Sequence, residues 1–162
     1  MKSVLAMILA GGRVDELLAL TEKRPKAALP IFGTYRIIDF TLSNMMHSGI
    51  DNVGVLSQYR PYSLTRHIGT GEHWDFTGRK RGVRILPPYQ GFHESDWYKG
   101  TADAVFQNVS YIEEYNPEHV LIAAGDHVYR MDYRELVKFH VENKADLTVC
   151  FTKAKEKSSW FV

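Results

Sequence analysis

The chain has 162 residues, of which 44% are hydrophobic and 24% charged, an ordinary composition for a soluble globular protein. This length is sufficient for one domain with a hydrophobic core. The 20 Lys and Arg residues and 19 Asp and Glu residues leave a formal net charge of +1. The charge balance therefore provides no electrostatic reason to expect nucleic acid or an anionic membrane as a partner.

The cysteine content and the hydropathy pattern both indicate a cytoplasmic protein. Cys150 is the only cysteine, so it cannot form an internal disulfide, and its apolar surroundings at 147–151 favour a buried structural thiol. No stretch approaches the roughly 18 apolar residues that a membrane-spanning helix needs. The apolar start at 4–10 runs directly into Gly11 and Gly12 without a signal-cleavage pattern, so we expect a buried first strand.

Short apolar runs along the chain predict strands that are buried on both faces, as in a parallel sheet. The clearest are residues 4–9, 52–56 and 119–124. Residues 146–151 are rich in Leu, Thr and Val and predict a fourth strand, and residues 83–86 predict a further short one.

Helical patterns alternate with these strands. Residues 101–115 are predicted to form an amphipathic helix whose apolar face is made by Ala102, Val105, Phe106, Val109 and Ile112. Asp132 resembles the first residue of a capping box that opens another helix, and residues 39–48 predict a third. The alternation predicts an α/β fold with an open, mostly parallel Rossmann-like sheet and helices on both faces.

Two loops follow predicted strands and carry residues suited to nucleotide chemistry. Gly11 and Gly12 come after the first strand, where glycines let backbone amides approach phosphate oxygens. Asp126 follows residues 119–124 and offers a carboxylate to a hard cation. Each feature alone is also typical of an ordinary turn or cap. Because ligands collect at the carboxyl ends of parallel strands, the pair suits a nucleotide bound with Mg²⁺.

Several motifs carry a family resemblance. Residues 7–12 and 20–26 resemble the opening of sugar nucleotidyltransferases. Residues 35–40 and 48–50 narrow the resemblance to the glucose-1-phosphate adenylyltransferase (ADP-glucose pyrophosphorylase) branch. Two later stretches, 97–105 and 125–129, resemble further motifs of this family in the expected order.

The resemblance implies an enzyme that transfers an adenylyl group from ATP to glucose 1-phosphate, giving ADP-glucose and pyrophosphate for glycogen or starch synthesis. Such chemistry depends mainly on positioning and on charge neutralisation, here with Mg²⁺ as cofactor. The family's catalytic residues correspond to Lys26, which would neutralise the triphosphate, and Asp126, which would bind the metal. Its nucleotide-binding positions correspond to Leu9, Ala10, Gly11, Gly12, Gln90, Gly100, Thr101 and Ala102.

The loop after the first strand departs from the family pattern Gly-Gly-x-Gly-x-Arg-Leu. Val14 stands where the family has its third glycine, and Glu16 stands where it has an arginine that grips the triphosphate. Arg13 or Lys23 is a candidate to replace the missing charge, and Tyr98 is a further substrate-facing candidate. Alternatively, the loop takes another path, or the chain is a catalytically impaired regulatory subunit.

The resemblance also bears on domain organisation and assembly. We expect residues 1–162 to be the amino-terminal portion of a catalytic domain, with the rest of that domain and a left-handed β-helix domain in the full-length protein. The isolated segment is predicted to bind nucleotide weakly without turnover. Relatives are usually tetramers, so homo- or hetero-oligomers are expected. A Rossmann oxidoreductase also fits the α/β pattern, but the full Gly-x-Gly-x-x-Gly helix start is missing.

Overall fold

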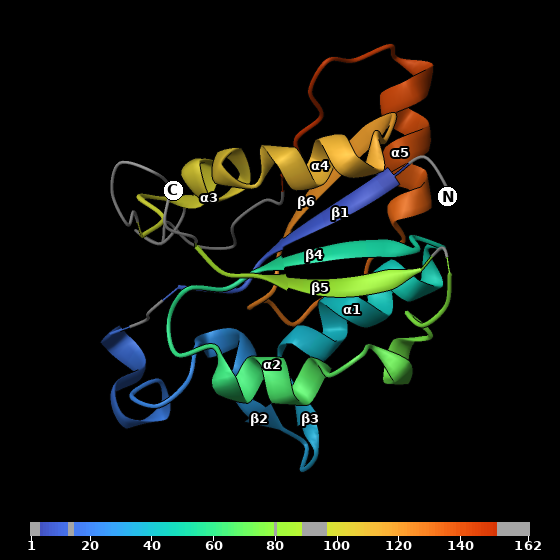
Figure 1. Cartoon of the computed structure of the whole chain (residues 1–162). Coiled ribbons are helices and arrows are strands. Elements are labelled where there is room, and N and C mark those ends of the chain that lie inside the picture. The colour runs from blue at the N-terminus through green and yellow to red at the C-terminus, as the bar shows by residue number, and fades with distance from the viewer. Residues whose placement is uncertain (1–3, 13–14, 80, 89–96, 152–162) are drawn as a thin grey trace.

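The computed structural model describes residues 4–12, 15–79, 81–88 and 97–151. Its centre is a parallel sheet of four strands in the order β5-β4-β1-β6 (Figure 1). The strands are β1 (Val4–Leu9), β4 (Asn52–Leu56), β5 (Gly82–Leu86) and β6 (His119–Ala124). The open, parallel α/β sheet predicted from the sequence is therefore confirmed, including the short strand at residues 83–86.

Helices cover both faces of this sheet, as predicted (Figure 1). One face carries α3 (Thr101–Gln107) and α4 (Val109–Tyr115). The opposite face carries α1 (Ile38–His47), α2 (Tyr62–Ile68) and α5 (Tyr133–Glu142). A small antiparallel hairpin of β2 (Pro30–Ile31) and β3 (Tyr35–Arg36) lies next to α2, away from the sheet.

The side chains of β1 contribute to two separate hydrophobic cores, one on each face of the sheet. Leu5 and Met7 pack with the α3 and α4 residues Ala104 and Tyr111. Their neighbours in sequence point the other way and join the larger core beneath α1 and α2. Because successive strand residues face opposite sides, an uninterrupted apolar run is what a strand covered on both faces requires.

The predicted helix at residues 101–115 is in fact two helices with a break at Asn108, whose φ and ψ are −104° and 22°. The predicted apolar face is wrong in part: Ile112 packs against the core beneath these helices, but Phe106 is 74% exposed and Val109 44% exposed. Ala104, Asn108 and Tyr111 face the sheet instead. The polar side chain of Asn108 lies on the buried face because it finds hydrogen-bond partners there.

The segment after α5 also differs from its prediction. Residues 146–151 contain no strand, and Cys150 is exposed rather than buried. Leu147 and Phe151 are exposed as well, so this apolar run packs little of its side-chain surface against the sheet. A β-rich composition by itself does not make a strand, because it reflects packing against neighbours and not an intrinsic backbone preference.

The outer strand β6 pairs with β1, and its second edge has no partner strand in the described part of the chain. On the face shared with α3 and α4, its residues Val120 and Ile122 are 40% and 52% exposed. This part of the sheet is therefore apolar but incompletely covered. No helix within the described residues combines the length and the apolarity needed to cross a bilayer.

Gly54 on β4 tests the packing of the smaller core. A Cβ at this position would lie 2.8 Å from Leu86 Cδ1, 2.9 Å from Tyr111 Cε1 and 3.1 Å from Met7 Sδ. We expect Gly54→Ala to lower the free energy of unfolding by about 1–3 kcal/mol through overpacking, measured by urea denaturation. Gly82→Ala is the matched control, since a Cβ there meets nothing within 4 Å. Equal stability of the two variants would contradict the packing described.

Candidate functional site

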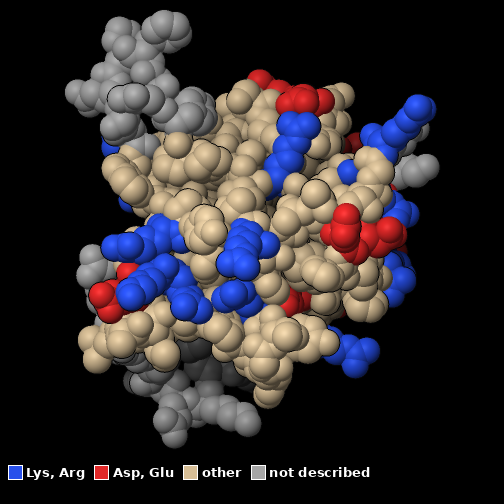
Figure 2. Space-filling model, turned by 60° about the horizontal axis from the view of Figure 1, so that its bottom comes forward, with Lys and Arg blue, Asp and Glu red and all other residues tan. Residues whose placement is uncertain are grey.

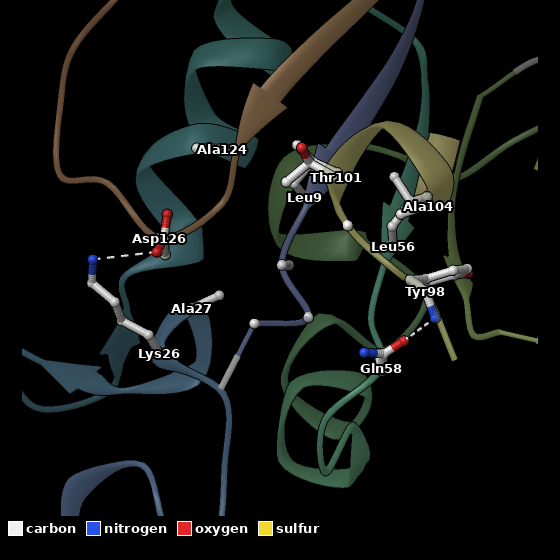
Figure 3. Close-up of a pocket in the computed structure, with 14 residues that line it drawn as sticks. Leu9, Lys26, Ala27, Leu56, Gln58, Tyr98, Thr101, Ala104, Ala124 and Asp126 are labelled. Atoms are coloured by element: carbon white, nitrogen blue, oxygen red, sulfur yellow. Dashed lines mark hydrogen bonds and ion pairs between the residues drawn. The ribbon is translucent and has the colours of Figure 1, made fainter. Parts of the chain in front are cut away.

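A cavity of about 320 Å³ opens at the carboxyl ends of β1, β4 and β6 (Figure 3). It lies where the sequence predicts a nucleotide, between the turn that follows β1 and the loop that follows β6. The lining residues are Leu9, Ala10, Gly11, Gly12, Lys26, Ala27, Leu56, Gln58, Tyr98, Gly100, Thr101, Ala104, Ala124 and Asp126.

Strand register brings the two loops together. β1 and β6 run parallel with Leu9 opposite Ala124, so both strands end at the same edge of the sheet. The Gly125 N–H then donates to the Leu9 carbonyl at 2.9 Å. A Cβ on Gly125 would lie only 2.8 Å from Ile8 Cγ2, so glycine is needed at this close approach. The expectation that the glycine turn and Asp126 share one rim is confirmed.

Polar side chains on α1 hold the loop that carries Asp126. Thr41 Oγ1 donates to the Ala124 carbonyl at 2.9 Å, and Asn44 Nδ2 donates to the Tyr129 carbonyl at 3.1 Å. Ser48 Oγ accepts from the N–H of Tyr133 at 2.9 Å. Burial of these α1 side chains strengthens such bonds and makes their loss costly. The segment after β6 is therefore anchored to α1 at Ala124, Tyr129 and Tyr133.

Lys26 and Asp126 form an ion pair on one side of the cavity, with 3.2 Å between Nζ and Oδ2 (Figure 3). Lys26 begins a 3-10 turn, Lys26–Ala28, whose two alanines are buried. Both charged side chains are 31% exposed, so a ligand in the cavity can reach them. His127 lies further out, 3.7 Å from the other Asp126 oxygen, and is 66% exposed.

The glycine turn after β1 is fixed against the segment that follows β4. Ala10 donates to the Leu56 carbonyl at 2.9 Å, and the Gly11 carbonyl accepts from Tyr59 N–H at 3.2 Å. A Cβ on Gly11 would lie 2.6 Å from the backbone nitrogen of Gln58, whereas one on Gly12 would meet nothing within 4 Å. Gly11 is thus required by internal packing, and Gly12 borders open space in the cavity.

Tyr98 and Gln58 form the wall opposite the charged pair (Figure 3). The Gln58 side-chain oxygen accepts from the backbone N–H of Tyr98. The Tyr98 hydroxyl donates to the Leu86 carbonyl at 3.0 Å. These contacts join the ends of β4 and β5 to the segment before α3.

Most of the predicted site residues meet in this cavity, and a few do not. Ala102 and Lys23 are exposed and do not line it. Arg13, Val14 and Gln90 lie outside the described residues, and so does the side chain of Glu16. The predicted residues that line the cavity are Leu9, Ala10, Gly11, Gly12, Lys26, Tyr98, Gly100, Thr101 and Asp126.

Sequence reasoning missed several lining residues: Ala27, Leu56, Gln58, Ala104 and Ala124. Leu56 and Ala124 are the last residues of their strands, so the rule that ligands collect at strand ends was sufficient to find them. Gln58 follows β4 by two residues and was accessible to the same reasoning. Ala27 and Ala104 carry no chemical signal in the sequence.

Among the residues that the structure describes, one carboxylate lines the cavity and could bind a divalent cation. Within the described residues no group of three His, Cys, Asp or Glu side chains is arranged to hold a metal. Asp126 is the acidic residue that lines the cavity. Mg²⁺ commonly binds nucleotide enzymes through one or two carboxylates together with substrate phosphates and water, so this donor set fits a cation shared with a polyphosphate.

A second, cationic cavity lies outside this site. Arg24, Arg36, Arg66, His67 and His73 line it together with Tyr62 and Ser63. Figure 2 shows Lys and Arg side chains gathered on the face that the view brings forward. Burial, with a smaller effect of Arg24, lowers the pKa of Arg36 from its ordinary value. Two buried polar atoms, Arg36 Nε and Ser63 Oγ, have no hydrogen-bond partner.

The fold and the first cavity define an α/β protein with a candidate ligand site at the carboxyl ends of its strands, and comparison with known proteins identifies its family. A family model described as nucleotidyl transferase matches residues 5–161. The chain therefore belongs to the nucleotidyl transferase family.

Curated relatives carry one common name. The chain is 54% identical to glucose-1-phosphate adenylyltransferase of Clostridium kluyveri, over 91% of the chain and 39% of that relative. It is also 54% identical to the protein of the same name from Thermotoga maritima, over 99% of the chain and 38% of the relative. The identity to the protein of the same name from Fervidobacterium nodosum is again 54%, over 92% of the chain and 36% of that relative. The chain thus spans less than two fifths of the length of these relatives.

Gly11 and Gly12 provide a matched test of the turn after β1. Gly11→Ala forces a methyl group against the backbone of Gln58, so we expect thermal unfolding to begin several degrees lower, the effect of about 1–3 kcal/mol of overpacking. Gly12→Ala meets no protein atom and is expected to leave the melting temperature of the unliganded chain nearly unchanged. Calorimetry measures both, and a larger loss for Gly12→Ala would show that the turn is packed differently.

Proposed function

We propose that this chain forms the nucleotide-binding part of a glucose-1-phosphate adenylyltransferase, which makes ADP-glucose and pyrophosphate from ATP and glucose 1-phosphate. The observation that carries the proposal is the meeting of the glycine turn with Lys26 and Asp126 in one cavity at the ends of β1 and β6. The names of the relatives supply the substrates.

Each side of the cavity has a part in this reaction. The turn at Gly11 and Gly12 offers backbone N–H groups toward phosphate oxygens, and Gly12 leaves room for their approach. Tyr98 and Thr101 line the opposite side, where a base and ribose would pack. A phosphate oxygen of glucose 1-phosphate attacks the α-phosphorus of ATP, and the bond to pyrophosphate breaks. Lys26 would neutralise charge on the phosphate oxygens.

Asp126 would hold Mg²⁺, which supplies further charge neutralisation on the polyphosphate when it is bound. Lys26 and Asp126 form an ion pair in the structure and balance each other's charge. The site is therefore close to neutral before a ligand arrives, and it contains one group for the metal and one for the phosphates.

The remaining parts of the proposal depend on the family resemblance. We infer that this segment is the amino-terminal part of the catalytic domain of a longer cytoplasmic protein, followed by a left-handed β-helix domain and assembled into oligomers. Glycogen or starch synthesis would use the product. The relatives' greater length supports a longer polypeptide, because 36–39% of it corresponds to this chain.

A second candidate function is that of a regulatory subunit with little catalysis of its own. The replacement of the family's glycine and arginine by Val14 and Glu16 favours it. The cationic cavity lined by Arg24, Arg36 and Arg66 also favours it, because a site with several guanidinium groups suits an anionic effector.

The main proposal is tested with the complete natural polypeptide that contains this sequence. With ATP, Mg²⁺ and glucose 1-phosphate we expect ADP-glucose formation, and Asp126→Asn is expected to reduce kcat about 100-fold or more because the metal loses its carboxylate. Asp146→Asn, at the opposite end of the sheet, is the control and is expected to retain activity. Turnover that requires a second type of subunit would favour the regulatory candidate, and absence of any ATP binding would exclude the catalytic proposal.

The regulatory candidate makes a separate prediction about the cationic cavity. Millimolar inorganic phosphate is expected to raise the melting temperature of the chain by binding the folded state, and Arg66→Gln is expected to remove most of this shift. Lys138→Gln, an exposed substitution on α5, controls for the loss of one positive charge. Equal melting-temperature shifts in the unsubstituted chain, Arg66→Gln and Lys138→Gln would mean that phosphate binds outside the cationic cavity.

A further inference from the structure

Asn108 is an unusual residue for its position. It is 5% exposed and faces the sheet between the buried residues Ala104 and Tyr111, where an apolar side chain is the usual choice. It also marks the break between α3 and α4. A buried amide is costly unless it is hydrogen-bonded, so the partners of Asn108 explain why it is tolerated.

The hydrogen bonds of Asn108 have an unambiguous direction. Its Nδ2 group lies 2.8 Å from the Ala104 carbonyl, which can only accept, so the NH₂ group faces this side. The same group lies 3.0 Å from the Tyr98 hydroxyl and donates its second proton there. The hydroxyl in turn donates its proton to the Leu86 carbonyl at 3.0 Å. Every proton in this chain of bonds has a defined acceptor.

These bonds connect Asn108 to the candidate site although Asn108 does not line the cavity. Tyr98 lines it, and the Tyr98 backbone is held by Gln58, next to the segment on which the glycine turn rests. The hydroxyl end of the Tyr98 side chain is fixed by Asn108 and Leu86. The orientation of the tyrosine ring at the cavity wall therefore depends on a residue behind it.

We propose that Asn108 is a positioning residue that fixes Tyr98 as a wall of the nucleotide cavity. This inference rests on the proposed function of the cavity and adds a residue that the sequence motifs did not indicate. Asn108→Asp keeps the size of the side chain but replaces both donated protons by acceptors. The Ala104 carbonyl and the Tyr98 hydroxyl then face a carboxylate, and the hydroxyl can satisfy it only by giving up Leu86.

A role limited to shaping the helix break makes a different prediction. In that case Asn108→Asp lowers stability but leaves the ligand affinity of the folded protein unchanged. Asn143 provides the matched control, because its Nδ2 also donates to the carbonyl four residues earlier, that of Phe139, at 2.8 Å. Asn143 has no contact with the cavity.

The experiment compares the wild type, Asn108→Asp and Asn143→Asp well below their melting temperatures, with two measurements. ATP with Mg²⁺ is titrated by calorimetry, and exchange of the Tyr98 amide hydrogen is followed by NMR relative to amides of β1, which report global unfolding. We expect Asn108→Asp to weaken ATP binding about 3- to 10-fold and to accelerate Tyr98 exchange by a similar factor. Asn143→Asp is expected to change neither.

A second variant keeps the test decisive if Asn108→Asp folds poorly. Tyr98→Phe removes the hydroxyl and leaves Asn108 in place, and it is expected to weaken ATP binding by a similar factor. In a double variant the two effects are expected not to add, because they break the same contact. Unchanged ATP affinity and unchanged Tyr98 amide exchange in Asn108→Asp would overturn the inference. A wild type that does not bind ATP would overturn the proposed function, while amide exchange still decides whether Asn108 positions Tyr98.

Discussion

The parallel, in-register pairing of β1 with β6 is the constraint on which the site depends. Leu9 lies opposite Ala124, so the backbone turn that follows one strand and the carboxylate that follows the other emerge at the same level. If the register between β1 and β6 were shifted by two residues, the turn and the carboxylate would be displaced along the strands by about 7 Å, given the rise per residue of a strand. No loop residue could then restore the Lys26–Asp126 pair, because α1 also fixes the loop after β6 through Thr41 and Asn44.

The sequence was sufficient to predict the parts of the molecule that depend on local patterns. The runs 4–9, 52–56 and 119–124 are short, apolar and bounded by turns, and loops that follow parallel strands meet at one edge whatever the rest of the fold does. Asn108 was not found, because its role arises from a contact with Tyr98, 10 residues away. Gln58 was within reach of the strand-end rule, but its bond to Tyr98, 40 residues away, was not. Residues 146–151 have the composition of a strand but form none, and Leu147 and Phe151 are exposed.

The two glycines after β1 belong to one motif, but each is required for a different physical reason. The sequence suggests that both glycines after β1 admit phosphate. In the structure Gly11 is required because the backbone of Gln58 occupies the place of its Cβ, and Gly12 alone faces open space. A substitution at either position would reduce nucleotide binding. At Gly11 the cause would be loss of the turn, and at Gly12 it would be loss of space for the ligand. Measurements of unliganded stability separate these causes.

The uncovered side of β6 has a practical consequence for handling the chain. In the described part of the chain the second edge of β6 has no partner strand and presents backbone donors and acceptors, and Val120 and Ile122 are exposed on one face of this strand. Such edges template pairing between molecules. Preparations of this segment by itself will therefore be prone to concentration-dependent aggregation. Solubility should improve when a lysine is introduced at Val120, toward the end of β6 that lies away from the cavity.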